Sequence, residues 1–315
     1  MAEENKKNQS QKEKIAAVVV TYNRKDLLKE CLDALLNQTR PLDSIILIDN
    51  ASKDGTPEFL KEKGYLDNPK IDYVRLSENT GGAGGFHEGV KRGYKKGYDW
   101  LWLMDDDVKP DNKCLEIFLE RIKEINENIK PVAVVGARYD FEGKFLNQET
   151  KKLNTSNPFK NLYQNIVSKK DLLKNYFLIE GFSFEGPLIS RNIIQKIGFP
   201  DKRFFIWADD TDFCLRIKKI GGKIYYIPNT KVIRMNKLIA MPLFKTGRAQ
   251  FLIRNLTYLD LKYGNLFVKL FRPIIRNGRF LLGRIYRRDF KNCKVVIFSF
   301  WNGIKMYLEK YNYFI

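Results

Sequence analysis

Carboxylate side chains cluster at two places in the sequence, and such clusters can bind a metal ion or accept a proton. Asp105, Asp106 and Asp107 follow the apolar run YDWLWLM, and Asp209 and Asp210 lie in the segment WADDTDF. Like charges at the end of a strand repel one another and are costly to bury, so a positive group is expected beside the first cluster. Mg²⁺ or Mn²⁺ commonly takes one or two carboxylates together with water and phosphate oxygens, which makes Asp105 and Asp107 candidate ligands.

Either cluster taken alone also has a structural explanation. Acidic turns are frequent, and the first cluster stands just before Pro110. Acidic side chains are also favourable in the first turn of a helix, where the second cluster falls. If Asp209 and Asp210 are instead functional, each raises the pKa of the other, so that one of them holds a proton more readily near neutral pH.

The elements that must position these acids alternate between strand and helix. Apolar runs at 15–24, 44–50, 71–77 and 99–105 predict buried strands, and the segments 26–38, 52–64, 84–97 and 114–125 predict helices. This order predicts an α/β fold with a parallel, doubly wound sheet that binds ligands beyond the carboxyl ends of its strands. Asp49, Asn79 and the first acidic cluster all fall at those ends. The less regular region 140–180 is expected to be an insertion or a mobile loop.

The charge of the chain is concentrated near its C-terminus. The net charge is +19 over 315 residues, and residues 237–315 hold sixteen Lys and Arg against three acids. Such a region is expected to bind a polyanion, either an anionic membrane surface or a nucleic acid. Basic and aromatic residues interleave in LFVKLFRPIIRNGRFLLGRIYRRDF, which predicts amphipathic helix broken near Pro273 and Gly278. A solvated basic bundle or an oligomer interface, and hence a homo-oligomer, would explain the same composition.

The N-terminal segment and the cysteines indicate the cellular compartment in which the protein is expected. Residues 1–14 are polar, lack the apolar core of a signal peptide and are expected to be a disordered lead. No stretch reaches about eighteen uncharged apolar residues, so a spanning helix is not expected. The four cysteines are widely spaced and show no CxxC pair, which indicates reduced, buried thiols in a cytoplasmic protein.

Five motifs together resemble glycosyltransferase family 2. They occur in the order VVVTYNR, IDNASKDGT, ENTGGAGG, LMDDDVKP and FFIWADDTDFCLR, and they cover residues 15–235. The forms NTGGAGGF and WADDTDF are most similar to the bacterial galactofuranosyltransferase and rhamnosyltransferase branch. The resemblance implies a GT-A fold over 15–235, followed by a basic helical region at 236–315. It also implies an inverting transferase that takes sugar from a UDP- or dTDP-linked donor.

The resemblance also implies roles for individual residues on the donor side. It places Thr21 and Asp49 at the nucleobase and ribose, with Asn23 and Arg24 nearby. Asp105 would face the ribose or a Mg²⁺ or Mn²⁺ ion, for which Asp107 would be the principal ligand. The remaining residues assigned to the donor are Asn79, Gly81, Gly82 and Asp106, and the glycines would let the backbone approach phosphates or the donor sugar.

On the acceptor side, the family's catalytic base corresponds to Asp210. Asp209 would hold the acceptor or adjust the pKa of its neighbour, and Asp212 is the less favoured base. Trp207 would either stack on an acceptor sugar or fill the core. Arg254 and Asn255 would contact a substrate or serve helix packing.

One position departs from the family pattern. Many relatives have a metal-binding histidine where this chain has Arg234, and a guanidinium cannot bind a metal. Arg234 would then pair with the diphosphate and replace part of the metal's charge. The single histidine, His87, lies in the Gly-rich helix and is expected to be a surface or packing residue.

The favoured hypothesis is therefore a metal-assisted transferase that adds galactofuranose or rhamnose to a polyprenyl-diphosphate-linked glycan, bound peripherally to the inner face of the cell membrane. A nucleic-acid-binding protein that uses the basic tail explains the charge but leaves the five motifs unexplained. An inactive relative that serves as a scaffold is the other alternative, motivated by Arg234.

Overall fold

The computed structural model of the protein describes residues 13–125, 132–236, 243–309 and 311–314. The expected N-terminal lead lies outside the described residues except for residues 13 and 14. The start of the expected basic region, at 237–242, also lies outside them.

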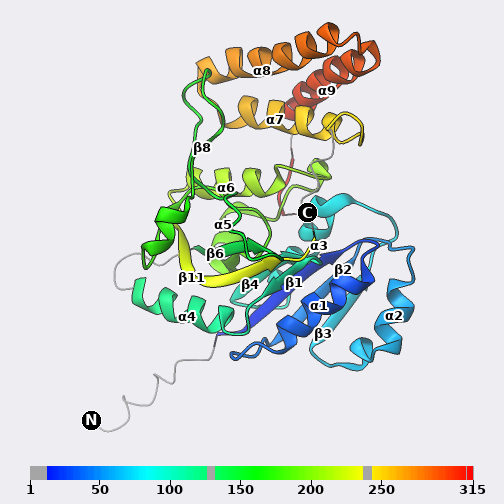
Figure 1. Ribbon diagram of the computed structural model, residues 1–315, viewed down its shortest axis with the longest axis vertical. Helices are drawn as coiled ribbons and strands as arrows, with labels where there is room; N and C mark the ends of the chain where they lie inside the picture. The colour runs from blue at the N-terminus through cyan, green and yellow to red at the C-terminus, as the bar shows by residue number, and fades with distance from the viewer. Residues whose placement is uncertain (1–12, 126–131, 237–242, 310, 315) are drawn as a thin grey trace.

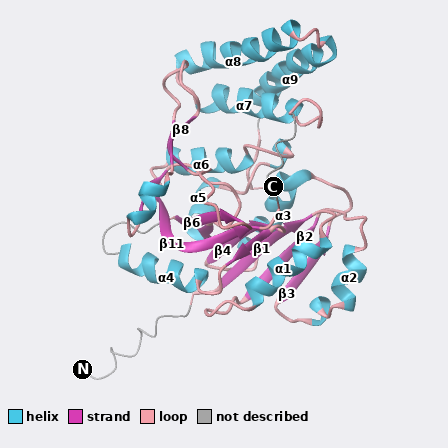
Figure 2. Cartoon of the chain, in the orientation of Figure 1, coloured by secondary structure: helices cyan, strands magenta, loops and turns pink. Residues whose placement is uncertain are grey.

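Within the described residues, nine strands form one sheet in the order β3-β2-β1-β4-β10-β6-β11-β5, with β9 paired to β11, and two more strands form a separate hairpin (Figure 2). The strands of the main sheet are β1 (Ile15–Thr21), β2 (Ser44–Asp49), β3 (Ile71–Arg75), β4 (Trp100–Asp105), β5 (Val108–Pro110), β6 (Ala133–Asp140), β9 (Phe177–Ile179), β10 (Leu188–Ser190) and β11 (Ile224–Arg234). The hairpin pairs β7 (Thr150–Leu153) with β8 (Tyr163–Ile166).

The helices up to α6 alternate with the strands along the chain, and the last three helices form a separate layer. The α-helices are α1 (Lys25–Leu36), α2 (Thr56–Glu62), α3 (Gly81–Lys95), α4 (Cys114–Ile125), α5 (Arg191–Ile197), α6 (Asp209–Lys219), α7 (Ala249–Tyr263), α8 (Leu266–Tyr286) and α9 (Phe290–Leu308). Short 3₁₀ helices cover Tyr65–Asp67, Lys169–Leu173 and Lys202–Phe204. Figure 1 shows α7, α8 and α9 stacked beyond α6, at the end of the molecule away from β1–β3.

Alternating side chains of β1 build the two cores of the doubly wound sheet. Ala16 and Val18 contribute to the core that includes α3, whereas Ala17 and Val19 contribute to the core that includes α1. Successive side chains of a strand point to opposite faces, so an uninterrupted apolar run is buried on both sides. Gly89 lets α3 lie close to this strand, because a Cβ atom there would stand 2.3 Å from a methyl carbon of Val18.

The predicted parallel arrangement is correct for the first four strands, but the second half of the sheet is mixed. β1, β2, β3 and β4 are parallel, but β10 runs antiparallel between β4 and β6, and β5 and β9 run antiparallel to β11. Each of these three strands has only three residues. A short apolar run reads the same in either direction, so the pattern alone cannot give its orientation.

The predicted break near Pro273 and Gly278 is also wrong, because α8 continues through both residues. Pro273 lacks the N–H that would bond to the carbonyl of Lys269, a loss that usually weakens a helix. Here the proline is buried, and Asn277 Nδ2 donates to its carbonyl at 2.8 Å and to Thr257 Oγ1 of α7 at 3.1 Å. Packing of α8 on α7 therefore maintains the helix.

The predictions for the cysteines and the histidine can be compared directly with their surroundings. All four cysteines are buried free thiols, as predicted. His87 is fully buried, and its Nδ1 lies 2.7 Å from the carbonyl oxygen of Pro200. His87 is therefore a packing residue and not a surface residue.

Candidate active site

The carboxyl end of β4 places Asp106 against the end of β1. Asp106 Oδ2 accepts hydrogen bonds from Thr21 Oγ1 at 2.7 Å and from the Tyr22 backbone N–H at 3.3 Å. Parallel neighbours bring their carboxyl ends to one edge of the sheet, which is why residues 85 positions apart meet here. Asp106 is nearly inaccessible to solvent, so its function within the chain is to fix this turn.

Two arginines provide the positive charge that the acidic run requires. Arg24 Nη1 lies 3.1 Å from Asp106 Oδ1 and 3.2 Å from Asp107 Oδ2. Arg234 Nε lies 3.8 Å from Asp107 Oδ2, and Arg234 Nη1 lies 3.0 Å from Glu185 Oε1. Arg24 remains 41% exposed, so its guanidinium can reach both the acids and a ligand in front of them.

Burial raises the pKa of each acid in this cluster. It raises the pKa of Asp106 to about 6 despite the opposing effect of Arg24. It also raises the pKa of Asp107, against the opposing effects of Arg234 and Arg24, and it raises the pKa of Asp105 well above its usual range, with Asp107 and Glu185 adding to the rise. Additional positive charge at this edge would stabilise the ionised cluster.

Asp107 retains a ligand atom suited to a hard cation. Its Oδ1 is buried and accepts no hydrogen bond from the residues that the structure describes. A carboxylate oxygen is the ligand that Mg²⁺ and Mn²⁺ prefer, so this atom fits such an ion. Within the described ranges, no group of three or more His, Cys, Asp or Glu side chains is arranged to hold a metal.

The predicted nucleotide residues gather at the ends of β1 and β2. Asn23 adopts a positive φ of 55°, its N–H donates to Ser52 Oγ at 3.0 Å, and its Oδ1 accepts from the Lys53 N–H at 2.7 Å. Asp49 is fully buried and accepts hydrogen bonds from the Ser52 N–H and the Tyr73 hydroxyl, each at 2.8 Å. Asp49 therefore holds the loop that follows β2 in place.

Hydrogen bonds hold the Gly-rich segment that begins at Gly81 against the carboxyl edge of the sheet. Asn50 Nδ2 donates to the Gly81 carbonyl at 2.8 Å, and Asn79 Oδ1 accepts from the Gly81 N–H at 2.8 Å. Gly81 has a φ of 72°, and a Cβ atom there would lie 2.0 Å from the carbonyl oxygen of Phe205. Only glycine fits at this crossing. Gly82 follows in the first turn of α3 and has open space around its Cα.

Residues 205–208 pass over Gly81 and lead directly into the second acidic cluster, Asp209 and Asp210. Phe205, Trp207 and Ala208 all have φ between 64° and 67°, an unfavourable region for residues with a side chain. Asn255 Nδ2 donates to the carbonyls of Ile206 and Trp207 at 2.9 and 2.8 Å. The interactions of Asn255 thus stabilise an otherwise strained backbone, which supports the packing interpretation of this residue. Arg254 has the same role, since its Nη2 donates to the carbonyls of residues 203 and 204.

Asp209 and Asp210 begin α6 at the end of that strained segment. Asp210 Oδ1 accepts from the Thr211 N–H at 2.5 Å, and Thr211 Oγ1 lies 3.0 Å from the Tyr163 hydroxyl. Burial raises the pKa of Asp210 to about 6 and that of Asp209 well above its usual range, where the charge of Asp210 contributes further. A carboxylate with a pKa near 6 is suited to proton transfer near neutral pH.

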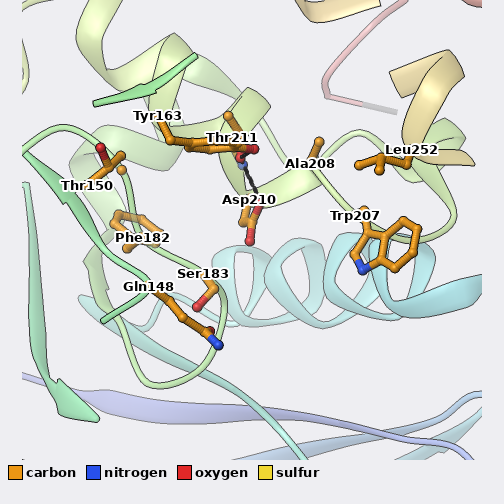
Figure 3. Close-up of a pocket in the computed structure, with 11 residues that line it drawn as sticks. Gln148, Thr150, Tyr163, Phe182, Ser183, Trp207, Ala208, Asp210, Thr211 and Leu252 are labelled. Atoms are coloured by element: carbon orange, nitrogen blue, oxygen red, sulfur yellow. Dashed lines mark hydrogen bonds between the residues drawn. The ribbon is translucent and has the colours of Figure 1, made fainter. Parts of the chain in front are cut away.

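Asp210 faces a cavity of about 260 Å³ (Figure 3). Figure 3 shows its carboxylate between Tyr163 and Ser183, with Trp207 and Leu252 at the other end of the group. Trp207 is 37% exposed and lines the cavity, so its ring is available to a ligand. An apolar wall with a few convergent polar groups is typical of a site for a small organic molecule.

Glu185 connects the two acidic clusters and was not predicted from the sequence. It pairs with Arg138 and Arg234, and its charge raises the pKa values of Asp105, Asp107 and Asp210. Arg138 is itself buried and also pairs with Glu149 at 2.6 Å. The available signal was a single carboxylate in the apolar segment GFSFEGPLIS, whose partners lie 47 and 49 residues away.

Asp212 differs from its two neighbours in α6. Its carboxylate binds Arg216 Nε at 2.9 Å, Lys262 Nζ at 2.9 Å and the Tyr263 hydroxyl at 2.7 Å. Burial alone would raise the pKa of Asp212, but Arg216 and Lys262 bring it below its usual value. The geometry therefore makes Asp212 a structural anchor between α6 and α7.

The chain matches the model of a known protein family. Residues 16–198 match Glycosyl transferase family 2, which is more than half of the chain. The chain belongs to this family. The predicted resemblance to the family and its GT-A fold is thereby confirmed.

Similar proteins include two sugar transferases of the predicted branch. Galactofuranosyltransferase GlfT1 of Mycolicibacterium smegmatis is 29% identical over 219 residues, which cover 66% of this chain and 67% of the relative. The dTDP-rhamnosyl transferase RfbF of Shigella flexneri is 26% identical over 233 residues, which cover 70% of this chain and 68% of the relative. The matched region thus spans about two thirds of each relative.

Solved structures share the fold. The crystal structure of GalNAc-T7 with UDP, GalNAc and Mn²⁺ has a TM-score of 0.56 at 16% identity and covers 82% of this chain and 54% of that one. The crystal structure of S. aureus TarS in complex with UDP has a TM-score of 0.52 at 15% identity and covers 93% of this chain and 89% of that one.

Proposed function

We propose that the protein is an inverting glycosyltransferase that moves a sugar from a nucleoside diphosphate to a hydroxyl of a glycan. The observation that carries this proposal is the presence of two acidic clusters that both feel the charge of Glu185, one beside two arginines and the other facing a cavity. The names of the relatives favour galactofuranose, or rhamnose from a dTDP-linked donor, as the transferred sugar.

The donor occupies the carboxyl edge of the sheet in this proposal. Thr21, Asn23 and Asp49 shape the nucleoside end, and the backbone around Gly81 and Gly82 approaches the phosphates or the donor sugar. Arg24 and Arg234 can each exchange part of their interaction with Asp107 for an interaction with the diphosphate. Charge-assisted bonds from arginine to phosphate are strong and directional, so this exchange favours donor binding.

Asp107, with Asp105, would hold a Mg²⁺ or Mn²⁺ ion that arrives with the donor. Such an ion stabilises the negative charge that develops on the departing diphosphate. The buried Oδ1 of Asp107 supports this assignment because it has no hydrogen-bond donor among the described residues.

The acceptor occupies the cavity in front of Asp210. Asp210 accepts the proton of the acceptor hydroxyl while that oxygen forms a bond to the anomeric carbon and the bond to the diphosphate breaks. Trp207 offers an aromatic surface to the acceptor sugar, and Asp209 tunes the pKa of the base. A lipid-linked glycan at the inner membrane face is the acceptor most consistent with the basic C-terminal region.

A thermal-shift panel of nucleotide sugars identifies the donor. We expect UDP- or dTDP-linked sugars to raise the melting temperature of the full chain, and to raise it more with Mn²⁺, because ligands that bind only the folded state stabilise it. GDP-linked sugars serve as the matched control and should have little effect. A folded protein that responds to none of these nucleotide sugars would contradict the proposal.

A further inference from the structure

Helix α8 turns its apolar side away from the protein. Phe267, Leu270, Phe271, Ile274 and Leu282 recur at helical spacing, and each is between 45% and 68% exposed. A helix that packs on a globular core normally buries such a stripe. We call these five side chains the α8 stripe.

The inward side of α8 combines the buried apolar residues Val268 and Pro273 with polar contacts to α7. Arg272 and Arg276 pair with Asp260 of α7 at 3.1 and 2.6 Å, and Asn277 bonds to Thr257 of the same helix. Arg272 and Asn277 are buried in these contacts. The outward direction of the α8 stripe is therefore fixed by ion pairs and hydrogen bonds between α7 and α8.

Helix α9 packs against α7 and α8 and exposes further large apolar side chains. Phe290, Ile297, Phe298, Trp301 and Leu308 are between 48% and 73% exposed. Figure 1 shows both helices at the end of the molecule away from β1–β3. Many large apolar side chains exposed together on two packed helices indicate an interaction surface.

The charge around the two helices identifies the partner. Residues 264–309 contain ten Lys and Arg against two acids, and the exposed cations include Arg279, Arg287, Lys291 and Lys294. A second copy of the chain would bring two strongly positive surfaces together, whereas an anionic bilayer attracts the cations and accepts the apolar groups. No described helix has the length and apolar character to cross a bilayer, so α8 would lie along its surface.

We propose that the α8 stripe and the exposed apolar side chains of α9 dock on a bilayer rich in anionic phospholipid. The inference rests on the proposed function, because it specifies how that enzyme reaches a lipid-linked acceptor. Leu252 of α7 lines the cavity in front of Asp210, and α7 packs directly on α8 and α9. Docking through α8 thus places the acceptor cavity one helix layer away from the lipid surface.

Co-sedimentation of the full chain with vesicles tests the docking surface. Wild-type protein is expected to bind vesicles of phosphatidylglycerol and phosphatidylcholine, and to bind pure phosphatidylcholine vesicles at least about tenfold more weakly. The double variant F271E/I274E is expected to lose about tenfold or more of the binding to anionic vesicles, because two apolar contacts become anionic. The matched control is F141E/L173E, which places the same charges on side chains that are 45% and 90% exposed in the 140–180 region, and it should bind like wild type.

A second variant and a second measurement keep the outcome decisive. If F271E/I274E unfolds, R279E/R287E changes only exposed cations and is expected to weaken binding to anionic vesicles by a similar factor. Binding by either folded variant equal to that of wild type would overturn the docking surface. Failure of wild type to bind anionic vesicles, with light scattering showing a dimer that F271E/I274E converts to monomer, would assign the surface to a second copy instead. Donor-induced thermal shifts on the same samples report the proposed function separately, since they do not involve α8.

Discussion

Replacing Asp210 with asparagine is expected to lower the rate of sugar transfer by about 10²–10⁴-fold, the range that general-base catalysis typically contributes. Asparagine has nearly the same shape, but it cannot accept the proton of the acceptor hydroxyl. Because Asp210 faces the cavity and not the arginines at the end of β4, donor affinity should stay near the wild-type value. Initial rates with saturating donor, together with donor affinity by calorimetry, check both parts.

The pH profile gives the same residue a second test. Burial raises the pKa of Asp210 to about 6, so the base is protonated and inactive below this pH and becomes active as the pH rises through it. The rate of transfer by wild type should therefore rise through about pH 6. The residual rate of Asp210→Asn should lack this rise, and a wild-type profile that falls through pH 6 would contradict the assignment.

Asp212 supplies the control for the chemistry of α6. It lies two residues further along the same helix, but its carboxylate is buried among Arg216, Lys262 and Tyr263. Asp212→Asn should therefore lower the melting temperature, because removing one partner leaves buried cations without compensation. Asp210→Asn should not produce such a decrease. If both variants lost only stability, Asp210 would be another structural acid.

Replacing Asp107 with asparagine is expected to abolish the effect of Mn²⁺ on donor binding. The change removes a buried charge and a ligand atom, Oδ1, that has no hydrogen-bond donor among the described residues. Residues that merely support metal ligands account for about 10–100-fold in metal affinity, so loss of a ligand should cost at least that much. Calorimetric titration of the protein with the donor, once with Mn²⁺ present and once after EDTA has removed the metal, measures the change in donor affinity.

Asp106→Asn is the matched control for this prediction. Asp106 is adjacent, equally buried and paired with the same Arg24, but both of its oxygens are already engaged by Thr21, Tyr22 and Arg24. Its variant should still respond to Mn²⁺. An Asp107→Asn protein whose donor affinity responds to Mn²⁺ as strongly as wild type would show that Arg24 and Arg234 stabilise the diphosphate without an ion at Asp107.

The local parts of this site could be predicted from the sequence, and the long-range parts could not. Runs of apolar residues ending in Asp49 or Asp105 predict strands whose carboxyl ends meet, because parallel neighbours share an edge. The partners of Glu185 lie on β6 and β11, and their contacts depend on the antiparallel insertion of β10. A short apolar run carries no signal of strand direction, so Glu185 could not be placed from the pattern.

The C-terminal region illustrates a second limit. Spacing correctly predicted an amphipathic helix around Phe271 and Ile274, but periodicity alone cannot say whether its apolar side faces the protein or the exterior. That direction is set by the contacts of Arg272 and Arg276 with Asp260, an acid in the preceding helix. The effect of Pro273 was overestimated for the same reason, since packing on α7 compensates for one missing hydrogen bond.

The anomeric configuration of the product tests the central claim most directly. Full-length protein is incubated with the donor identified by thermal shift and a short synthetic glycan acceptor, and the new linkage is determined by NMR. A single displacement assisted by Asp210 predicts that the configuration of the transferred sugar is inverted relative to the donor. A product with retained configuration would contradict the account, because it requires a second displacement or a front-face departure that a base at Asp210 does not provide.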